Sequence, residues 1–142
     1  LQLMVPFCRT PEEGEMVTDL LNQKGIGPDS GTDLFVMVEL PSNVIEADRF
    51  IEMMELSGGS IGSNDLVQTV YAVSRDDLEG YQNPIDARSP SVKSMIRQIV
   101  EKFNSRGLEI GICGQAPSDF PDEFPPFRRL RVIPLFKLRS QL

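Results

Sequence analysis

The chain has 142 residues, of which 40% are hydrophobic, and this is enough for one ordinary globular core, so we expect a single domain over residues 1–142. Its formal net charge of −7 argues against nucleic acid or an anionic membrane as a partner. No apolar run approaches the roughly 20 residues that cross a bilayer, and the first residues lack a signal-peptide pattern, so we expect a cytoplasmic location. The sequence contains no histidine. Chemistry therefore has to rely on carboxylates, cysteine, arginine or a partner.

The first part of the chain contains two units in which a β-rich run precedes a helical pattern. A strand is predicted in residues 1–7, followed by a helix that Thr10 begins together with Glu13 in a capping box. Residues 33–41 form a nearly continuous apolar run, which is typical of a buried parallel strand. Residues 42–56 then carry apolar side chains at helical spacing.

Two more units follow. Residues 58–66 predict a short strand, a weaker helix follows it, and the polar stretch 74–89 indicates a long loop. Residues 89–107 give the clearest helix, because their apolar side chains fall on one face. Residues 108–113 predict a fourth strand. Repeated strand–helix units with right-handed crossovers predict a parallel sheet of the α/β class.

The predicted architecture is a partial (β/α)₈ barrel of the TIM type, because such a barrel has roughly 250 residues and this chain would supply about half. A nucleotide-binding doubly wound sheet is the weaker alternative, since the sequence lacks a glycine-rich phosphate loop. In a barrel, chemistry lies where the strands end. The residues at these ends are Phe7, Cys8, Arg9, Glu39, Asn64, Asp65 and Cys113. Such a set suits a hard divalent cation and an anionic, oxygen-rich substrate.

Four strings occur in order between Leu3 and Pro121: MVPFCRTPEEG, VMVELPSNVIEADRF, SIGSNDLVQ and GICGQAPSDFP. Together they resemble consecutive motifs of the C-terminal barrel domain of the phosphoenolpyruvate-utilising enzymes. The Arg-Thr pair and the form GICGQAPSD are most similar to the phosphoenolpyruvate synthase branch. The resemblance implies phosphoenolpyruvate or pyruvate as substrate and Mg²⁺, or Mn²⁺ in its place, as cofactor. It also implies phosphotransferase activity, of the pyruvate, water dikinase type, for a complete enzyme.

The resemblance assigns the metal to two carboxylates. Glu39 and Asp65 match the family's metal-binding pair, which holds Mg²⁺ between the enolate and phosphoryl oxygens of the substrate. Two carboxylates are sufficient, because Mg²⁺ usually keeps several waters. The alternative for Glu39 is a solvent-facing carboxylate before a proline, and the alternative for Asp65 is a helix N-cap.

The resemblance also implies substrate-binding residues. Asn64 matches a residue that contacts the phosphoryl group, while Gly62 and Ser63 bring backbone N–H groups to the same place. A plain turn explains these three nearly as well. Arg75 matches a phosphate-contacting arginine, with a surface salt bridge as its rival interpretation. Gln115 would shape the loop after the last strand.

Cys113 matches the family cysteine that exchanges a proton with the methylene carbon as enolpyruvate and pyruvate interconvert. Neighbouring Mg²⁺ and arginines would favour its thiolate. The alternative is an ordinary core thiol, which is the interpretation of Cys8.

The departures from the family also carry expectations. The family's two further substrate arginines, its phosphohistidine domain and its nucleotide-binding domain have no counterpart in this sequence, and residues 122–142 form a divergent tail. We therefore do not expect the isolated chain to be a competent enzyme. The alternative function is a non-catalytic module that binds phosphoenolpyruvate or pyruvate, or a structural remnant. Either would associate with itself or with a partner chain that supplies the missing half of the barrel.

Overall fold

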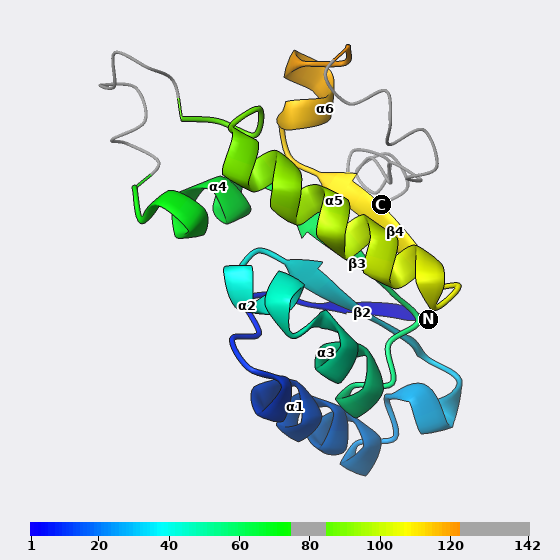
Figure 1. Ribbon diagram of the computed structural model, residues 1–142. Helices are drawn as coiled ribbons and strands as arrows, with labels where there is room; N and C mark the ends of the chain where they lie inside the picture. Colours follow the sequence, from blue (N-terminus) through cyan, green and yellow to red (C-terminus); the bar gives the residue numbers. More distant parts are fainter. Residues whose placement is uncertain (75–84, 123–142) are drawn as a thin grey trace, which may run out of the picture.

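The structure is a computed structural model, which describes residues 1–74 and 85–122. Its strands are β1 (Gln2–Val5), β2 (Asp33–Val38), β3 (Gly58–Gly62) and β4 (Glu109–Cys113). They form one sheet in the order β1-β2-β3-β4, and every neighbouring pair is parallel (Figure 1). A doubly wound sheet reverses its strand order at a switch point, whereas consecutive barrel strands do not. The sheet thus has the order predicted for a partial barrel.

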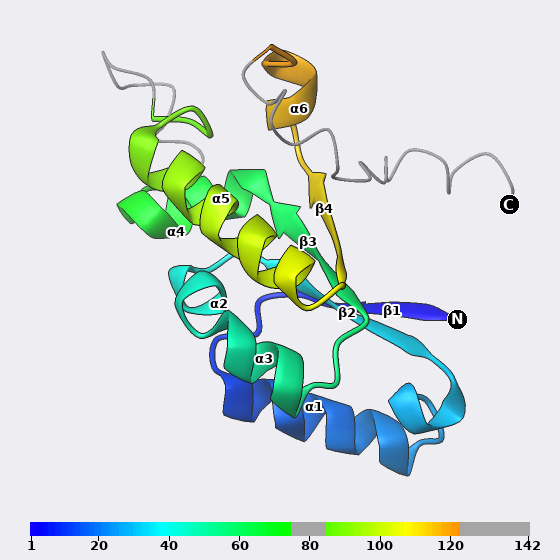
Figure 2. The ribbon, with the colours of Figure 1, turned by 45° about the vertical axis from the view of Figure 1, so that its right-hand side comes forward.

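The helices lie mainly on one side of this sheet. They are α1 (Pro11–Gln23), α2 (Pro41–Ile45), α3 (Ala47–Met53), α4 (Ser63–Tyr71), α5 (Pro90–Ser105) and α6 (Ala116–Asp119), with a short 3₁₀ turn η1 (Pro28–Ser30). Figure 2 shows α1, α3 and α5 on the same side of the strands. We call this the helix-covered face of the sheet and the other side the opposite face.

The hydrophobic core lies between β2–β4 and the helices. Alternate residues of β2, beginning with Leu34, belong to the core cluster, as expected when side chains of a strand point to opposite sides in turn. On α5, Val92, Ile96, Ile99 and Phe103 fall at helical spacing and are at most 1% exposed. This packing fixes the strands whose carboxyl ends form the candidate site.

Helix boundaries follow the sequence with two corrections. The Oγ1 of Thr10 accepts the N–H of Glu13 at 3.2 Å, as predicted, but the carboxylate of Glu13 accepts the N–H of Arg9 at 2.9 Å, one residue before the cap. The predicted capping box is therefore shifted by one residue on its carboxylate side. The single helix predicted for residues 42–56 is instead two helices that meet at Glu46.

Some expectations fall outside the described residues. Arg75 and all but the first residue of the 122–142 tail lie there. Within residues 1–74 and 85–122, no helix combines the length and the hydropathy that a membrane span requires.

Candidate functional site

The carboxyl end of β2 places Glu39 on the opposite face of the sheet. Phe35 and Met37 precede it at alternate positions, and Glu39 is 4% exposed. A Cβ atom added to Gly62 would lie 2.7 Å from the Cγ and 2.9 Å from the Oε1 of Glu39. The side chain of Glu39 therefore extends across β3, and only glycine at position 62 leaves room for it.

Hydrogen bonds from two other elements fix Glu39. Its Oε2 accepts the N–H of Phe7 at 3.0 Å, from the segment between β1 and α1. Its backbone carbonyl accepts the hydroxyl of Thr69, on α4, at 2.6 Å. The alternative interpretation of Glu39, a carboxylate that faces the solvent, is therefore wrong.

The surroundings of Glu39 are electronegative. Burial raises the pKa of its carboxyl, the Phe7 N–H lowers this pKa, and the negative charge of Asp65 raises it. No lysine or arginine of residues 1–74 and 85–122 is among the causes of this pKa shift. A buried carboxylate within electrostatic reach of a second one is stabilised either by a proton or by a cation.

Asp65 is the third residue of α4. Gly62 occupies the N-cap position of this helix, so the alternative interpretation of Asp65 as an N-cap is wrong. Its Oδ1 accepts the amide of Gln68 at 3.3 Å, and the residue is half-buried. In the described part of the chain, no group of three or more cysteine, aspartate or glutamate side chains could hold one metal ion. An ion bound by Glu39 and Asp65 would therefore find no third carboxylate or thiolate ligand among the described residues.

Cys113 ends β4 on the same face and is half-buried. Its thiol donates to the carbonyl of Ile61, with an S···O distance of 3.4 Å. Burial raises the pKa of the Cys113 thiol; a hydrogen bond with Ser60 lowers it, and the charges of Glu39 and Asp65 raise it. The described residues therefore favour the thiol, and no arginine or lysine among them is a cause of this pKa shift.

The turn after β4 is fitted to the start of α4. Ser63 is fully buried and donates through Oγ to the carbonyl of Cys113 at 2.9 Å. Gly114 has a φ of 104°, and a Cβ atom there would collide with the Oγ of Ser63. Both features require glycine at position 114. The first turn of α4 and the end of β4 are thereby held together.

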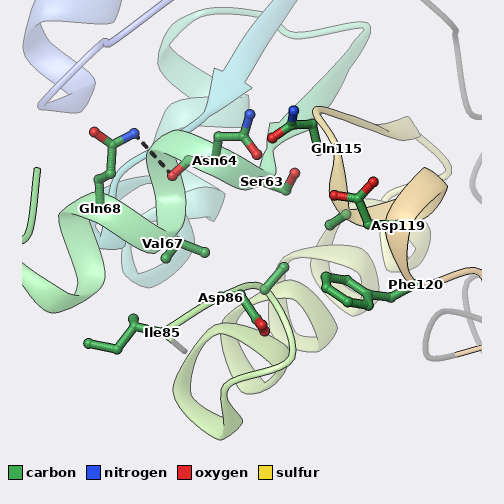
Figure 3. A pocket seen from close by; sticks show the side chains of 11 residues that line it. Ser63, Asn64, Val67, Gln68, Ile85, Asp86, Gln115, Asp119 and Phe120 are labelled. Carbon is green, nitrogen blue, oxygen red and sulfur yellow. Dashed lines mark hydrogen bonds between the residues drawn. The ribbon is translucent and has the colours of Figure 1, made fainter. Parts of the chain in front are cut away.

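A pocket of about 630 Å³ lies beside this junction, between the first turns of α4, the segment before α5 and α6 (Figure 3). Asn64 and Gln115 present their amide groups side by side at its edge, and Asp119 points toward it. The described residues that line it are Ser63, Asn64, Val67, Gln68, Ile85, Asp86, Ala87, Gln115, Ala116, Asp119 and Phe120.

The structure thus separates the sequence-derived residues into two adjoining groups. Ser63, Asn64 and Gln115 line the pocket, whereas Glu39 and Cys113 lie on the opposite face of the sheet, within electrostatic reach of Asp65. Gly62 lies under Glu39, and Ser63 joins the two groups through its bond to Cys113. Arg9, another residue of the strand ends, is exposed and pairs with Glu13 instead.

Sequence reasoning placed Phe7 at a strand end but missed its hydrogen bond to Glu39, and it missed the roles of Thr69 and Asn43. The backbone N–H of Phe7 and the hydroxyl of Thr69 bond Glu39, and Asn43 holds the turn that follows β2. Only the role of Asn43 could have been inferred from the sequence, because it is an amide among apolar residues near the start of a predicted helix. The other two depend on contacts between segments that are 30 or more residues apart.

Comparisons of the sequence with known proteins identify a family. A family described as "PEP-utilising enzyme, PEP-binding domain" matches residues 1–123. The phosphoenolpyruvate synthase of Aquifex aeolicus (strain VF5) is 45% identical over 127 residues, which are 89% of this chain and 14% of that protein. The phosphoenolpyruvate synthase of Synechocystis sp. (strain ATCC 27184 / PCC 6803 / Kazusa) is 46% identical over 125 residues, 87% of this chain and 15% of that protein.

Solved structures support the fold alone. An HpcH/HpaI aldolase/citrate lyase family protein from Burkholderia cenocepacia J2315 has a TM-score of 0.68 at 15% identity, over 94% of this chain and 57% of that one. The citrate synthase SbnG has a TM-score of 0.61 at 15% identity, over 94% of this chain and 55% of that one. The four parallel strands with their helices are part of a (β/α) barrel.

The match to the family model covers most of the chain, while the chain spans only 14% and 15% of the length of these two relatives. The ordered strand-end motifs, the consecutive parallel strands and the sequence identity all lead to the same conclusion. The chain belongs to the family of PEP-utilising enzymes and corresponds to their PEP-binding domain.

Proposed function

We propose that the chain is a phosphoenolpyruvate synthase-like domain that supplies the metal-binding and proton-transfer half of a phosphoenolpyruvate/pyruvate site. The observation that carries the proposal is the convergence of Glu39, Asp65 and Cys113, which follow or end three successive strands. The charges of both carboxylates act on the pKa of the Cys113 thiol, so the three groups share one electrostatic environment. The names of the matched family and relatives support the choice of substrate.

Glu39 and Asp65 are the proposed ligands of Mg²⁺, with Mn²⁺ as a substitute. The donor set fits, because both side chains offer carboxylate oxygens and the buried charge of Glu39 lacks a cationic partner in the described part of the chain. When bound, the ion would stabilise negative charge on the enolate and phosphoryl oxygens of the substrate. The fixed carboxylate of Glu39 limits where this charge can be stabilised.

Cys113 is the proposed proton carrier. In the direction of pyruvate, its S–H bond breaks and the proton goes to the methylene carbon of the enolate, whose C=C electron pair forms the new C–H bond of the methyl group. The thiolate that remains takes the proton back in the reverse direction. The raised pKa of Cys113 keeps the proton on sulfur at neutral pH. Burial is the main cause of this raised pKa and the charges of Glu39 and Asp65 add to it, so a cation that counters these charges would favour proton removal from pyruvate.

Asn64, Ser63 and Gln115 are proposed to bind the substrate where the pocket reaches the first turn of α4. Gly62 belongs with them, because it leads the backbone into that turn. The N–H groups of a first helical turn favour anionic oxygens, which suits a phosphoryl group. Arg75 is included on the strength of the family resemblance.

A non-catalytic function is the second candidate: a module that binds phosphoenolpyruvate or pyruvate, or a structural remnant, acting with itself or with a partner chain. The observation in its favour is the absence of histidine from the sequence, so this chain cannot carry a phosphoryl group on an imidazole. A cytoplasmic location, as expected from the sequence, is part of both proposals.

Titration calorimetry with Mn²⁺ tests the metal assignment. Binding should be weak for Mn²⁺ alone and tighter with oxalate, which imitates the enolate of pyruvate. Glu39→Gln should lower the affinity by at least about tenfold, because one of two charged ligands becomes neutral. Glu15→Gln, an equal charge change at an exposed position of α1, is the matched control. Equal affinities for wild type and Glu39→Gln would contradict the assignment.

Proton exchange distinguishes the two candidate functions. A catalytic half-site should exchange the methyl protons of pyruvate with deuterated solvent in the presence of Mg²⁺. Cys113→Ala should abolish that exchange and leave oxalate binding intact. Oxalate binding without any exchange in the wild-type chain would favour the binding module.

A further inference from the structure

Asn43 is a buried amide whose hydrogen bonds join two segments of the site. It is 2% exposed and is the third residue of α2. Its Oδ1 accepts the N–H of Glu39 at 3.1 Å and that of Leu40 at 2.9 Å. Its Nδ2 donates to the carbonyl of Cys8 at 2.7 Å, across 35 positions of sequence. One side chain therefore ties the end of β2 to the segment between β1 and α1.

The segment that Asn43 holds is the one that bonds the Glu39 carboxylate. Phe7 immediately precedes Cys8, and its N–H donates to the Oε2 of Glu39 at 3.0 Å. Phe7 has a φ of 49°, in the left-handed region that a bulky residue seldom adopts. Such a conformation persists only when the surrounding contacts hold it. The hydrogen bond of Asn43 to the next residue is one of these contacts.

These contacts form a closed ring. It runs from the carboxylate of Glu39 to the Phe7 N–H, along the backbone to the Cys8 carbonyl, through the amide of Asn43 and back to the Glu39 N–H. A glutamate side chain has several rotatable bonds, and binding a metal ion restricts them. If hydrogen bonds already hold the side chain before the metal binds, less conformational freedom is lost on binding. An oxygen that accepts one N–H can still bind a cation through its other lone pair.

We infer that Asn43 is a positioning residue for Glu39: by holding the Phe7–Cys8 segment, it directs the Phe7 N–H at the Glu39 carboxylate and fixes that carboxylate for a divalent cation. The inference rests on the proposed metal function of Glu39. Outer partners of metal ligands commonly act in this way, and their loss typically lowers metal affinity about 10–100-fold.

The competing role for Asn43 is to begin α2 and nothing more. That role needs only Oδ1, which accepts the Leu40 N–H, whereas the bond from Nδ2 to Cys8 leaves the helix. Asn43→Asp separates the two roles, because it keeps the acceptor oxygen and puts a second oxygen against the Cys8 carbonyl. Ser42→Ala is the matched control, since it removes a 2.8 Å bond from the Ser42 hydroxyl to the carbonyl of Arg9 in the same segment.

The test uses the whole chain and two readouts. The first is the hydrogen-exchange rate of the Phe7 amide, measured by NMR without metal, and the second is the calorimetric affinity for Mn²⁺. Asn43→Asp should speed Phe7 exchange by about tenfold or more and weaken Mn²⁺ binding by about tenfold, measured at high salt that screens the added carboxylate charge. Ser42→Ala should leave both unchanged. Slow exchange of the Ile99 amide, in the core of α5, reports that the fold is retained.

A second variant covers the case in which Asn43→Asp does not fold. Cys8 allows a synthetic peptide of residues 1–7 to be ligated to residues 8–142, and the Pro6–Phe7 amide can be made as an ester. The ester removes only the Phe7 donor, so it should weaken Mn²⁺ binding by about the same factor as Asn43→Asp. The combined variant should lose little more than either alone, because both act through one ring.

The outcomes distinguish this inference from the function on which it rests. Unchanged Phe7 exchange and unchanged Mn²⁺ affinity in folded Asn43→Asp would overturn it, and so would wild-type affinity in the ester chain. The wild-type chain could fail to bind Mn²⁺ while Asn43→Asp still speeds the exchange of the Phe7 amide. That pair of results would support the positioning of Glu39 and contradict its metal function.

Discussion

The two faces of the sheet are built from different side chains. On β2, Leu34, Val36 and Val38 point into the helix-covered face and are at most 2% exposed. On the opposite face, β3 presents Gly58 and Gly62 at the places where Phe35 and Glu39 cross it. Branched aliphatic residues stabilise one face, while on the other the glycines of β3 leave room for the side chains of Phe35 and Glu39 to extend across the strand.

This contrast indicates a division between stability and binding. Substitutions on the helix-covered face should change the free energy of unfolding, because they remove buried apolar contacts. Substitutions on the opposite face at the strand ends should change affinity more than stability.

Phe103→Ala should lower the free energy of unfolding by about 3–5 kcal/mol, because it replaces a phenyl ring that is only 1% exposed with a cavity. Urea denaturation measures the change. Met4→Ala, at a strand position that is 38% exposed, should cost about 1 kcal/mol or less. Similar losses for the two variants would break the proposed division.

Gly62→Ala and Gly59→Ala form a matched pair on one strand. A Cβ atom at Gly62 would displace Glu39, so Mn²⁺ affinity should fall by at least about tenfold. A Cβ atom at Gly59 would lie 3.0 Å from the Cε1 of Phe103 on the helix side, so it should cost about 1–3 kcal/mol of stability. Calorimetry and urea denaturation on both proteins would sharpen the comparison. The prediction fails if Gly59→Ala reduces affinity as much as Gly62→Ala.

The pH dependence of stability should reveal the buried charge of Glu39. Because burial raises its pKa in the folded state above the ordinary 4.5, the unfolded chain releases this proton first as pH rises. Wild type should therefore lose stability relative to Glu39→Gln as pH rises from that value through the folded-state pKa. Chemical denaturation of both proteins over this range measures the difference. A difference that grows in favour of wild type with rising pH would contradict the assignment.

Arg106→Ala should have the smallest effect. Its guanidinium, at the C-cap of α5, pairs with the exposed carboxylates of Asp48 and Glu52 on α3, each at 3.0 Å. Exposed ion pairs contribute about 0–1 kcal/mol, and salt weakens them. Urea denaturation at low and high salt should show a small change that shrinks with salt. A loss as large as that of Phe103→Ala would show that the surface, not the core, stabilises the helices.

Much of the fold was predictable because its signals are local. The apolar run of β2 and the face of α5 were visible as periodic patterns, and they occur where predicted. The break at Glu46 was not visible, because apolar spacing continues across it. The end of β1 at Val5 was also missed, since the left-handed backbone of Phe7 depends on distant contacts.

The candidate site was predictable in part, for the same reason. Strand-end position and family resemblance singled out Glu39, Asp65 and Cys113, and the structure brings them within electrostatic reach. Their metal and proton-transfer roles stay predictions. The bonds that fix Glu39 were not predictable, because they join it to Phe7 and Thr69, which are 32 and 30 positions away. Such contacts depend on the register of the sheet, which one sequence does not specify.

The most direct test of the central claim is the alkylation rate of Cys113, with Cys8 as an internal control. Cys113 is half-buried and Cys8 is 4% exposed, so Cys113 should react faster. If Glu39, Asp65 and Cys113 form one site, Mg²⁺ with oxalate should slow the reaction of Cys113, leave that of Cys8 unchanged, and give no protection in Glu39→Gln. An unchanged rate at Cys113 in the wild-type chain, at Mg²⁺ and oxalate concentrations that saturate binding, would contradict the account.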